Sequence, residues 1–206
     1  MKQSLLPFAV CALGIGLAIA APAAAAPVVL TGPEHRLNAQ EIRDLAKREL
    51  LWCDDFHAQN GSCDAVSLIT LAPDGRLAET TTMLLSDGPR IQAFIGEVDD
   101  VEGDRVCSKV TAAQLPIAFT LEGKAVPSEA SASLRDVLVN SLAELDGKTI
   151  CQTFYRGSDP NKLREEVTVD GKRRKDLETV YQLHDGKDGF DLRPQVKGDA
   201  DKGTKA

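Results

Sequence analysis

The chain has few of the residues on which most enzyme and nucleic-acid sites depend. It contains three histidines, and aromatic residues make up 4% of its 206 positions. Such a low aromatic content argues against a platform on which bases or sugars stack. Lysine and arginine number 24 against 31 aspartates and glutamates, which gives a formal net charge of −7. This excess of acid disfavours nucleic acid, because such binding depends on neutralising phosphates with basic side chains.

No established catalytic or cofactor motif is present. The region beyond the N-terminal apolar segment contains no G-x-S-x-G, H-E-x-x-H, P-loop or dinucleotide-binding fingerprint. It also contains no C-x-x-C, which argues against a thioredoxin-like redox centre. We therefore predict no catalytic residue, no metal ligand and no cofactor.

The N-terminal residues are typical of a secretory signal peptide. Lys2 is followed by an uncharged apolar run to Ala20 and then by an alanine- and proline-rich stretch. Cleavage fits after Ala20 or after Ala25, and we favour Ala25 because the composition turns polar just beyond it. The alternative is an uncleaved anchor, since the run approaches the roughly 20 residues needed to cross a bilayer. We predict that residues 1–25 are a signal peptide and that the remainder is periplasmic or secreted, not an integral membrane protein.

Four cysteines follow the predicted signal peptide: Cys53, Cys63, Cys107 and Cys151. An even number in an exported chain indicates disulfides, because that compartment is oxidising. Three pairings are open, and proximity in sequence favours Cys53 with Cys63 and Cys107 with Cys151. In the chain-entropy model the shorter loop is worth about 2.8 kcal/mol and the longer loop about 4 kcal/mol.

Two amphipathic helices are expected. Asn38 and Glu41 have the spacing of a capping box, and apolar residues then recur at helical intervals up to Leu50, which predicts a helix that runs to about Leu51. A second apolar stripe at 134–145 ends at a glycine.

The other segments have the patterns of strands joined by tight turns. Each expected strand is rich in apolar or β-branched residues, and the set is 65–71, 76–85, 90–98, 105–111, 117–121, 149–156, 163–169 and 177–183. Turns such as Asp74-Gly75 favour antiparallel pairing of consecutive strands. The predicted fold class is α+β: two amphipathic helices packed on a mainly antiparallel sheet of hairpins and meanders, stapled by disulfides.

About 180 residues beyond the signal peptide are enough for one domain with a substantial core, or for two small ones. We expect one α+β domain at residues 26–197. The alternative is two halves that divide near residues 112–128. Residues 198–206 are rich in glycine, aspartate and lysine, which predicts a disordered tail.

The densest group of reactive side chains is WCDDFHAQNGSC at residues 52–63. As a zinc site it offers thiols, carboxylates and an imidazole, but zinc sites usually have closer cysteine spacing. We prefer a structural disulfide that holds Asp54, Asp55 and His57 as a pre-organised recognition loop. The plainer alternative is that these three residues only solvate the loop.

Two further features carry weaker hypotheses. His184 and Asp185 form a conceivable catalytic pair, although a polar strand end is the commoner meaning of such a pattern. The basic run at 172–175 could meet anionic lipid headgroups. Because acidic residues bracket this run, we prefer an edge strand that its charges keep unpaired.

These observations predict an exported, disulfide-bonded α+β domain that is a non-enzymatic binding or envelope-accessory protein. Its partner would be an envelope protein, a lipid or a small molecule, and not a nucleic acid. The alternative is a small periplasmic hydrolase or metal-dependent enzyme that uses His57 or His184 with a nearby aspartate.

Overall fold

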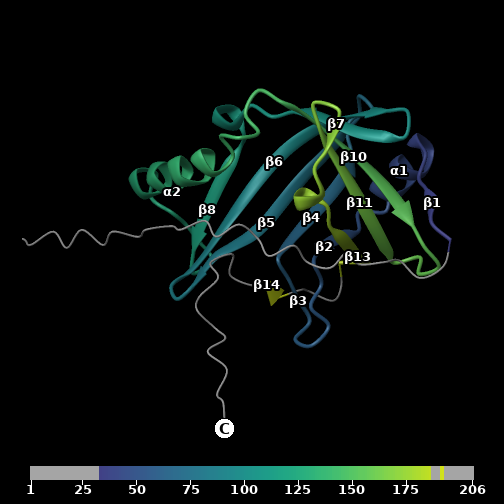
Figure 1. Ribbon diagram of the computed structural model, residues 1–206. Helices are drawn as coiled ribbons and strands as arrows, with labels where there is room; N and C mark the ends of the chain where they lie inside the picture. The colour runs from purple at the N-terminus through teal and green to yellow at the C-terminus, as the bar shows by residue number, and fades with distance from the viewer. Residues whose placement is uncertain (1–32, 187–190, 193–206) are drawn as a thin grey trace, which may run out of the picture.

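The computed structural model describes residues 33–186 and 191–192 (Figure 1). The predicted signal peptide and the predicted tail at 198–206 lie outside these residues. In chain order the elements are β1 (His35–Arg36), α1 (Ala39–Ala46), β2 (Leu51–Asp54), β3 (Ser62–Cys63), β4 (Ala65–Leu71), β5 (Leu77–Asp87), β6 (Arg90–Glu102), β7 (Arg105–Lys109), the 3-10 turn η1 (Ala112–Gln114), β8 (Ile117–Leu121), β9 (Lys124–Ala125), α2 (Ser128–Ser141), β10 (Thr149–Arg156), β11 (Lys162–Val169), β12 (Lys172–Arg173), η2 (Lys175–Leu177), β13 (Val180–His184) and β14 (Asp191–Leu192).

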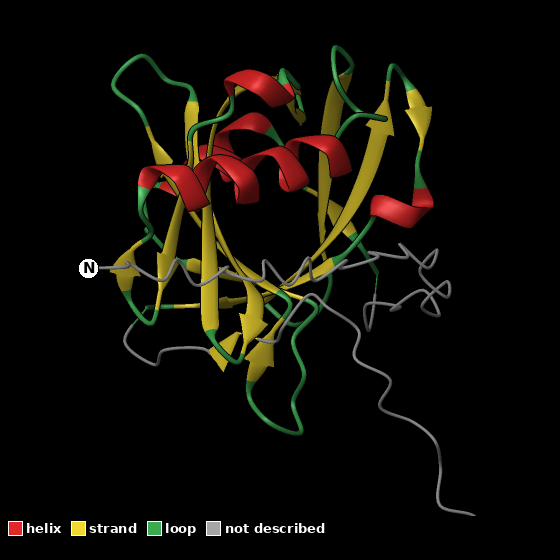
Figure 2. Ribbon diagram, turned by 90° about the vertical axis from the view of Figure 1, so that its left-hand side faces the viewer, coloured by secondary structure: helices red, strands yellow, loops and turns green. Residues whose placement is uncertain are grey.

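The main sheet closes on itself. Twelve strands belong to it, and the antiparallel order β10–β11–β13–β2–β4–β5–β6 forms most of the circuit. The strand β7 pairs with β6 on one side and with β10 on the other, which completes a ring. Strands from both sides of residues 112–128 contribute to this ring, and they curve around its interior (Figure 2). The strands β8 and β9 continue from β6 outside the circuit.

One face of the ring encloses the hydrophobic core. The strand β11 alternates strictly, with every second residue from Leu163 to Val169 buried. Such alternation assigns successive side chains to opposite faces of a sheet. The helix α1 lies at one end of the ring, near β1 (Figure 1), and buries Ile42, Leu45 and Ala46 in the same core.

A capping box starts α1 at the predicted place. The Asn38 side chain accepts hydrogen bonds from the backbone N–H groups of Gln40 and Glu41 at 2.9 and 3.1 Å, and the Glu41 carboxylate accepts one from the Asn38 N–H at 2.9 Å. Replacing Asn38 by alanine is expected to lower the free energy of unfolding by about 1 kcal/mol, because the first-turn N–H groups lose their acceptor. Urea denaturation measures this loss, with Asn140→Ala on the exposed surface of α2 as the control. Equal stabilities of the two variants would contradict the prediction.

The mostly antiparallel sheet, the two helices and the two disulfides are confirmed. The strands at 65–71, 117–121 and 149–156 have the predicted bounds. The packing of α2 on the sheet is not confirmed: none of its residues is buried, and Val137 is 52% exposed. This helix lies beside β8, outside the closed ring (Figure 1). Neither described helix has the length and the apolar run that crossing a bilayer requires.

Candidate functional site: an acid-lined interior beside a cavity

Carboxylates occupy inward positions of the ring where apolar residues would be expected. The register places Glu79 of β5 opposite Ile69 of β4 on one side and opposite Glu97 of β6 on the other. Ile69 belongs to the buried core. Directly opposed residues share a face of the sheet, so both glutamates point inward.

Three more carboxylates are inward by the same reasoning. Asp99 is opposite the core residue Leu77, Glu165 is opposite the core residue Phe154, and Asp54 is opposite a buried alanine of β4. The five inward carboxylates are called the acidic cluster below, and they are Asp54, Glu79, Glu97, Asp99 and Glu165.

Hydroxyl groups donate hydrogen bonds to three carboxylates of this cluster. The Tyr181 hydroxyl donates to Glu165 Oε2 at 3.2 Å, the Thr81 hydroxyl donates to Glu79 Oε1 at 2.8 Å, and the Thr179 hydroxyl donates to Asp54. Glu165 is only 2% exposed, and its Oε1 atom has no hydrogen-bond partner within the described part of the chain. The ion pairs between described residues include no member of the cluster. Among the described residues, no member of the cluster is therefore in an ion pair with a basic side chain.

Burial without a positive partner favours the protonated carboxyl. Burial, reinforced by the charges of Asp99 and Glu79, raises the pKa of Glu97 to about 7. Burial is also the main reason why the pKa of Asp54 and of Asp99 rises to about 6. The pKa of Glu165 lies well above its usual range, because burial and the charges of Asp54 and Glu79 outweigh the hydrogen bonds from its neighbours. Asp54, Glu97 and Asp99 therefore exchange protons at pH values of about 6 to 7.

A cavity of about 310 Å³ opens where β7 and β8 diverge from β6. The strand β6 pairs with β8 as far as Ile95, the Gly96 N–H donates to the Pro116 carbonyl at 2.9 Å, and pairing with β7 begins at Asp100, which leaves a gap in the sheet along residues 97–99. Glu97, Ser108 and Lys109 line the cavity with polar groups, and its apolar lining comes from Val98, Leu115 and Pro116. Glu97 therefore belongs to both the cavity and the acidic cluster.

Both predicted disulfides are formed. Cys53 and Cys63 lie 5.5 Å apart between Cα atoms, and Cys107 and Cys151 lie 4.1 Å apart. The second bridge joins directly opposed residues of β7 and β10. It therefore lies at the pairing that completes the ring.

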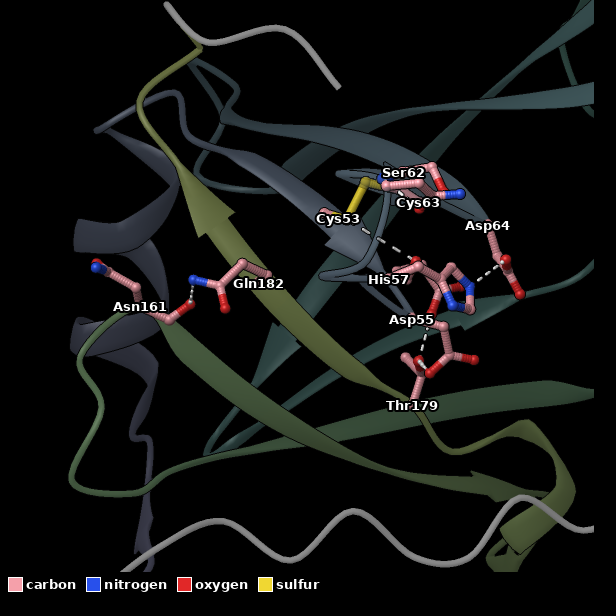
Figure 3. Close-up of a disulfide and its surroundings, with 11 residues drawn as sticks. Cys53, Asp55, His57, Ser62, Cys63, Asp64, Asn161, Thr179 and Gln182 are labelled. Carbon is pink, nitrogen blue, oxygen red and sulfur yellow. Dashed lines mark hydrogen bonds and ion pairs between the residues drawn. A yellow bond between two sulfur atoms is a disulfide. The ribbon is translucent and has the colours of Figure 1, made fainter. Parts of the chain in front are cut away.

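The three residues of the predicted recognition loop occupy different environments, and Figure 3 shows Asp55 and His57. Asp54 is part of the inward-facing cluster. Asp55 is exposed and accepts a hydrogen bond from the Thr179 hydroxyl at 3.3 Å. His57 Nε2 lies 2.9 Å from a carboxylate oxygen of Asp64. Recognition by this loop stays a prediction, and the geometry leaves Asp55 as its exposed carboxylate.

The other candidate residues have structural partners. His184 is in β13, opposite Leu51 of β2, and its ring lies 6.0 Å from that of Phe56. In the basic run, Arg173 forms ion pairs with Glu166 and Glu178. Within residues 33–186 and 191–192, no three His, Cys, Asp or Glu side chains are arranged to hold a metal ion.

Known proteins offer no relative from which to transfer a function: the chain matches no family model, no curated protein and no solved structure. The acidic cluster and the cavity are therefore the basis of the functional argument.

Proposed function

We propose that the protein is an exported, non-enzymatic binding protein whose ligand is a small molecule held in the cavity beside β6. The observation that carries this proposal is that Glu97 lines the cavity and also belongs to the acidic cluster. A ligand in the cavity would lie beside Glu97, whose pKa is already raised by burial and by the charges of Asp99 and Glu79. A volume of about 310 Å³ lies within the range of small-molecule sites. The two disulfides support export, because such bonds persist in oxidising compartments.

A small molecule fits this site better than the other expected partners, an envelope protein or a lipid. The cavity is too small to take more than a few side chains of a protein. A lipid with an anionic headgroup would be repelled by the acidic cluster. In the basic run that might have attracted such a headgroup, two of the four residues, Arg173 and Arg174, form ion pairs with acids.

The alternative function is a small hydrolase or metal-dependent enzyme that uses His57 or His184 with a nearby aspartate. The observation in its favour is the 2.9 Å contact between His57 Nε2 and Asp64, which resembles the base-and-orienter part of a catalytic triad. Turnover of an ester or amide panel by the purified protein, abolished by His57→Gln, would favour this enzyme over the binding protein.

Filling the cavity tests the proposed function. A Cβ atom at Gly96 would lie 3.5 Å from the Cβ atom of Pro116, an ordinary contact, so a larger side chain there occupies the cavity. A ligand-observed NMR screen of small molecules is expected to find binders of the wild type whose affinity falls at least about tenfold in Gly96→Leu. The control is Ala118→Leu, an exposed position of β8 that does not line the cavity. Ligands that bind Gly96→Leu as tightly as the wild type, or a screen that finds no ligand, would contradict the proposal.

A further inference from the structure

The helix α2 buries none of its residues, and yet it contacts the wall of the cavity. Residues 111–116, called the wall segment below, include two of the large apolar residues that line the cavity, Leu115 and Pro116. The Arg135 side chain of α2 donates a hydrogen bond from Nη2 to the carbonyl oxygen of Ala113, in the middle of this segment, at 2.8 Å. The helix therefore supports the cavity wall without lining the cavity.

The turn that follows α2 supports the same segment. The Asp146 carboxylate accepts a hydrogen bond from the Ala112 N–H at 2.9 Å. Because Ala112 is only 2% exposed, water does not replace this acceptor, and a buried N–H group without a partner is costly. The Gly147 N–H donates to the Val110 carbonyl and the Val110 N–H donates to the Lys148 carbonyl, both at 2.9 Å. The turn and the start of the wall segment are therefore one connected unit.

On its other side the wall segment is attached to the sheet. The Gly96 N–H of β6 donates to the Pro116 carbonyl at 2.9 Å. The position of Leu115 therefore depends on an attachment to β6 and on an attachment to α2, which lies beside β8 (Figure 1). The attachment to α2 is the weaker, because a helix without buried side chains lacks the apolar contacts that keep a core element folded. This helix is the part of the support that detaches at the lowest free energy.

We propose that α2 regulates the cavity: while the helix lies beside β8, Arg135 and Asp146 hold the wall segment against β6, and when it detaches the segment loses its position. This inference rests on the proposed function and names the regulation of the same site. A compound in contact with Leu115 and Pro116 should stabilise the docked helix. A partner that displaces the helix should weaken the binding of that compound by the same factor, because coupling between two sites is reciprocal. Arg135 and Asp146 are positioning residues, since neither lines the cavity.

Amide hydrogen exchange of the protein without added compounds, measured by NMR, tests the connection. We expect Arg135→Ala to speed the exchange of the Ala112 and Gln114 amides about fivefold, the change produced by the loss of one hydrogen bond of ordinary net strength. Asp136→Ala removes an exposed side chain from the same turn of α2 and should leave both amides unchanged. The urea midpoints of both variants should equal that of the wild type, because α2 buries no residue. Unchanged exchange in Arg135→Ala overturns the proposal.

Asp146 provides a second test of the same coupling. Asp146→Ala removes the acceptor of the Ala112 N–H and should speed exchange in α2 as well as in the wall segment. Asp146→Asn keeps an acceptor oxygen in the same place and should exchange as the wild type does. If Asp146→Ala speeds exchange in the wall segment alone, the helix and the wall move independently, and the proposal is wrong.

The tightest-binding compound of the small-molecule screen serves as the probe of regulation. Its affinity should fall about fivefold in Arg135→Ala and stay unchanged in Asp136→Ala, and its binding should slow exchange in α2. Equal affinities of Arg135→Ala and the wild type overturn the regulation, while the cavity remains a binding site if Gly96→Leu blocks it. A screen that finds no compound overturns the proposed function and the regulatory role together, whatever the exchange measurements show.

Discussion

Replacing Glu165 by glutamine is expected to stabilise the protein at pH 8 and to change its stability little at pH 5. Glu165 is 2% exposed, and its pKa in the folded protein lies well above the usual value. The folded wild type must therefore keep a proton that the unfolded chain has already released at pH 8. Glutamine has the same shape, accepts the hydrogen bond from Tyr181 and has no proton to lose. We expect a gain of about 1–3 kcal/mol at pH 8, the typical cost associated with a poorly satisfied buried polar group.

The direction of the pH dependence follows from where the protons are bound. Asp54, Glu97, Asp99 and Glu165 all have a higher pKa in the folded protein than the ordinary values that apply to the unfolded chain. Between about pH 4 and pH 7 the folded state therefore holds more protons, and the free energy of unfolding falls as the pH rises. Each group contributes up to about 1.4 kcal/mol per pH unit within its own window. The wild type is expected to lose at least about 3 kcal/mol between pH 5 and pH 8.

Urea denaturation at pH 5, 6, 7 and 8 measures both effects. Glu165→Gln should show a shallower fall with pH than the wild type, because one proton fewer is released on unfolding. Glu166→Gln is the matched control, since this neighbour is on the outer face and forms ion pairs with Arg164 and Arg173 at 2.9 and 3.2 Å. It should leave the pH slope unchanged. A Glu165→Gln variant that is less stable than the wild type at pH 8 would show that Glu165 is ionised and paired.

Removing the bridge between Cys107 and Cys151 is expected to cost more stability than removing the bridge between Cys53 and Cys63. The first pair is separated by 44 residues in sequence and the second by 10. Cross-linking the longer loop removes more entropy from the unfolded chain, so the double alanine variants should lose about 4 and about 2.8 kcal/mol respectively. The longer bridge also joins β7 to β10, where the ring closes.

Denaturant unfolding followed by far-UV circular dichroism, at pH 5, gives the two losses directly. All four cysteines are at most 9% exposed, so alanine removes a buried sulfur at each position and the difference between the variants reports on the loops. Hydrogen exchange adds a local measure: the amides of β7 and β10 should lose protection in the Cys107→Ala/Cys151→Ala variant, and those of β5 should not. Equal losses for the two pairs, or protection in β7 and β10 that survives, would contradict the importance of the longer bridge.

Local sequence patterns were sufficient to predict the long strands and the start of the first helix. Hairpin strands such as β4 and β5 are close in sequence, so alternation and a turn at Asp74-Gly75 define both members. The first helix ends at Ala46, before the predicted end near residue 51, because Trp52 and Cys53 pair in β2 with β4 and β13. The two-residue strands β1, β3 and β14 have no such pattern. They are defined by partners elsewhere in the chain.

The alternation of the sequence indicates the inward position of two members of the acidic cluster, although a charged residue is normally expected on the outer face of a sheet. Glu165 alternates in phase with Leu163 and Val167, and Glu79 alternates in phase with Leu77. Adjacent residues of a strand point to opposite faces, and the burial pattern of β11 accordingly buries Glu165 and leaves Glu166 on the outer face. Alternation does not reveal that both glutamates face the same enclosed space, because Glu79 and Glu165 are on strands that the ring brings together.

The sequence by itself determined the α+β class, most strand positions, the capping box and the proximity that favours the two disulfide pairings, since each depends on residues that are near one another in the chain. Only the tertiary structure decided that the sheet closes through β7, that the β6 edge at residues 97–99 borders a cavity, and that Glu97 links this cavity to four other inward carboxylates. These features depend on pairings between distant strands, such as Lys109 with Thr149. Their free energy comes from long-range contacts that no local pattern of side chains encodes.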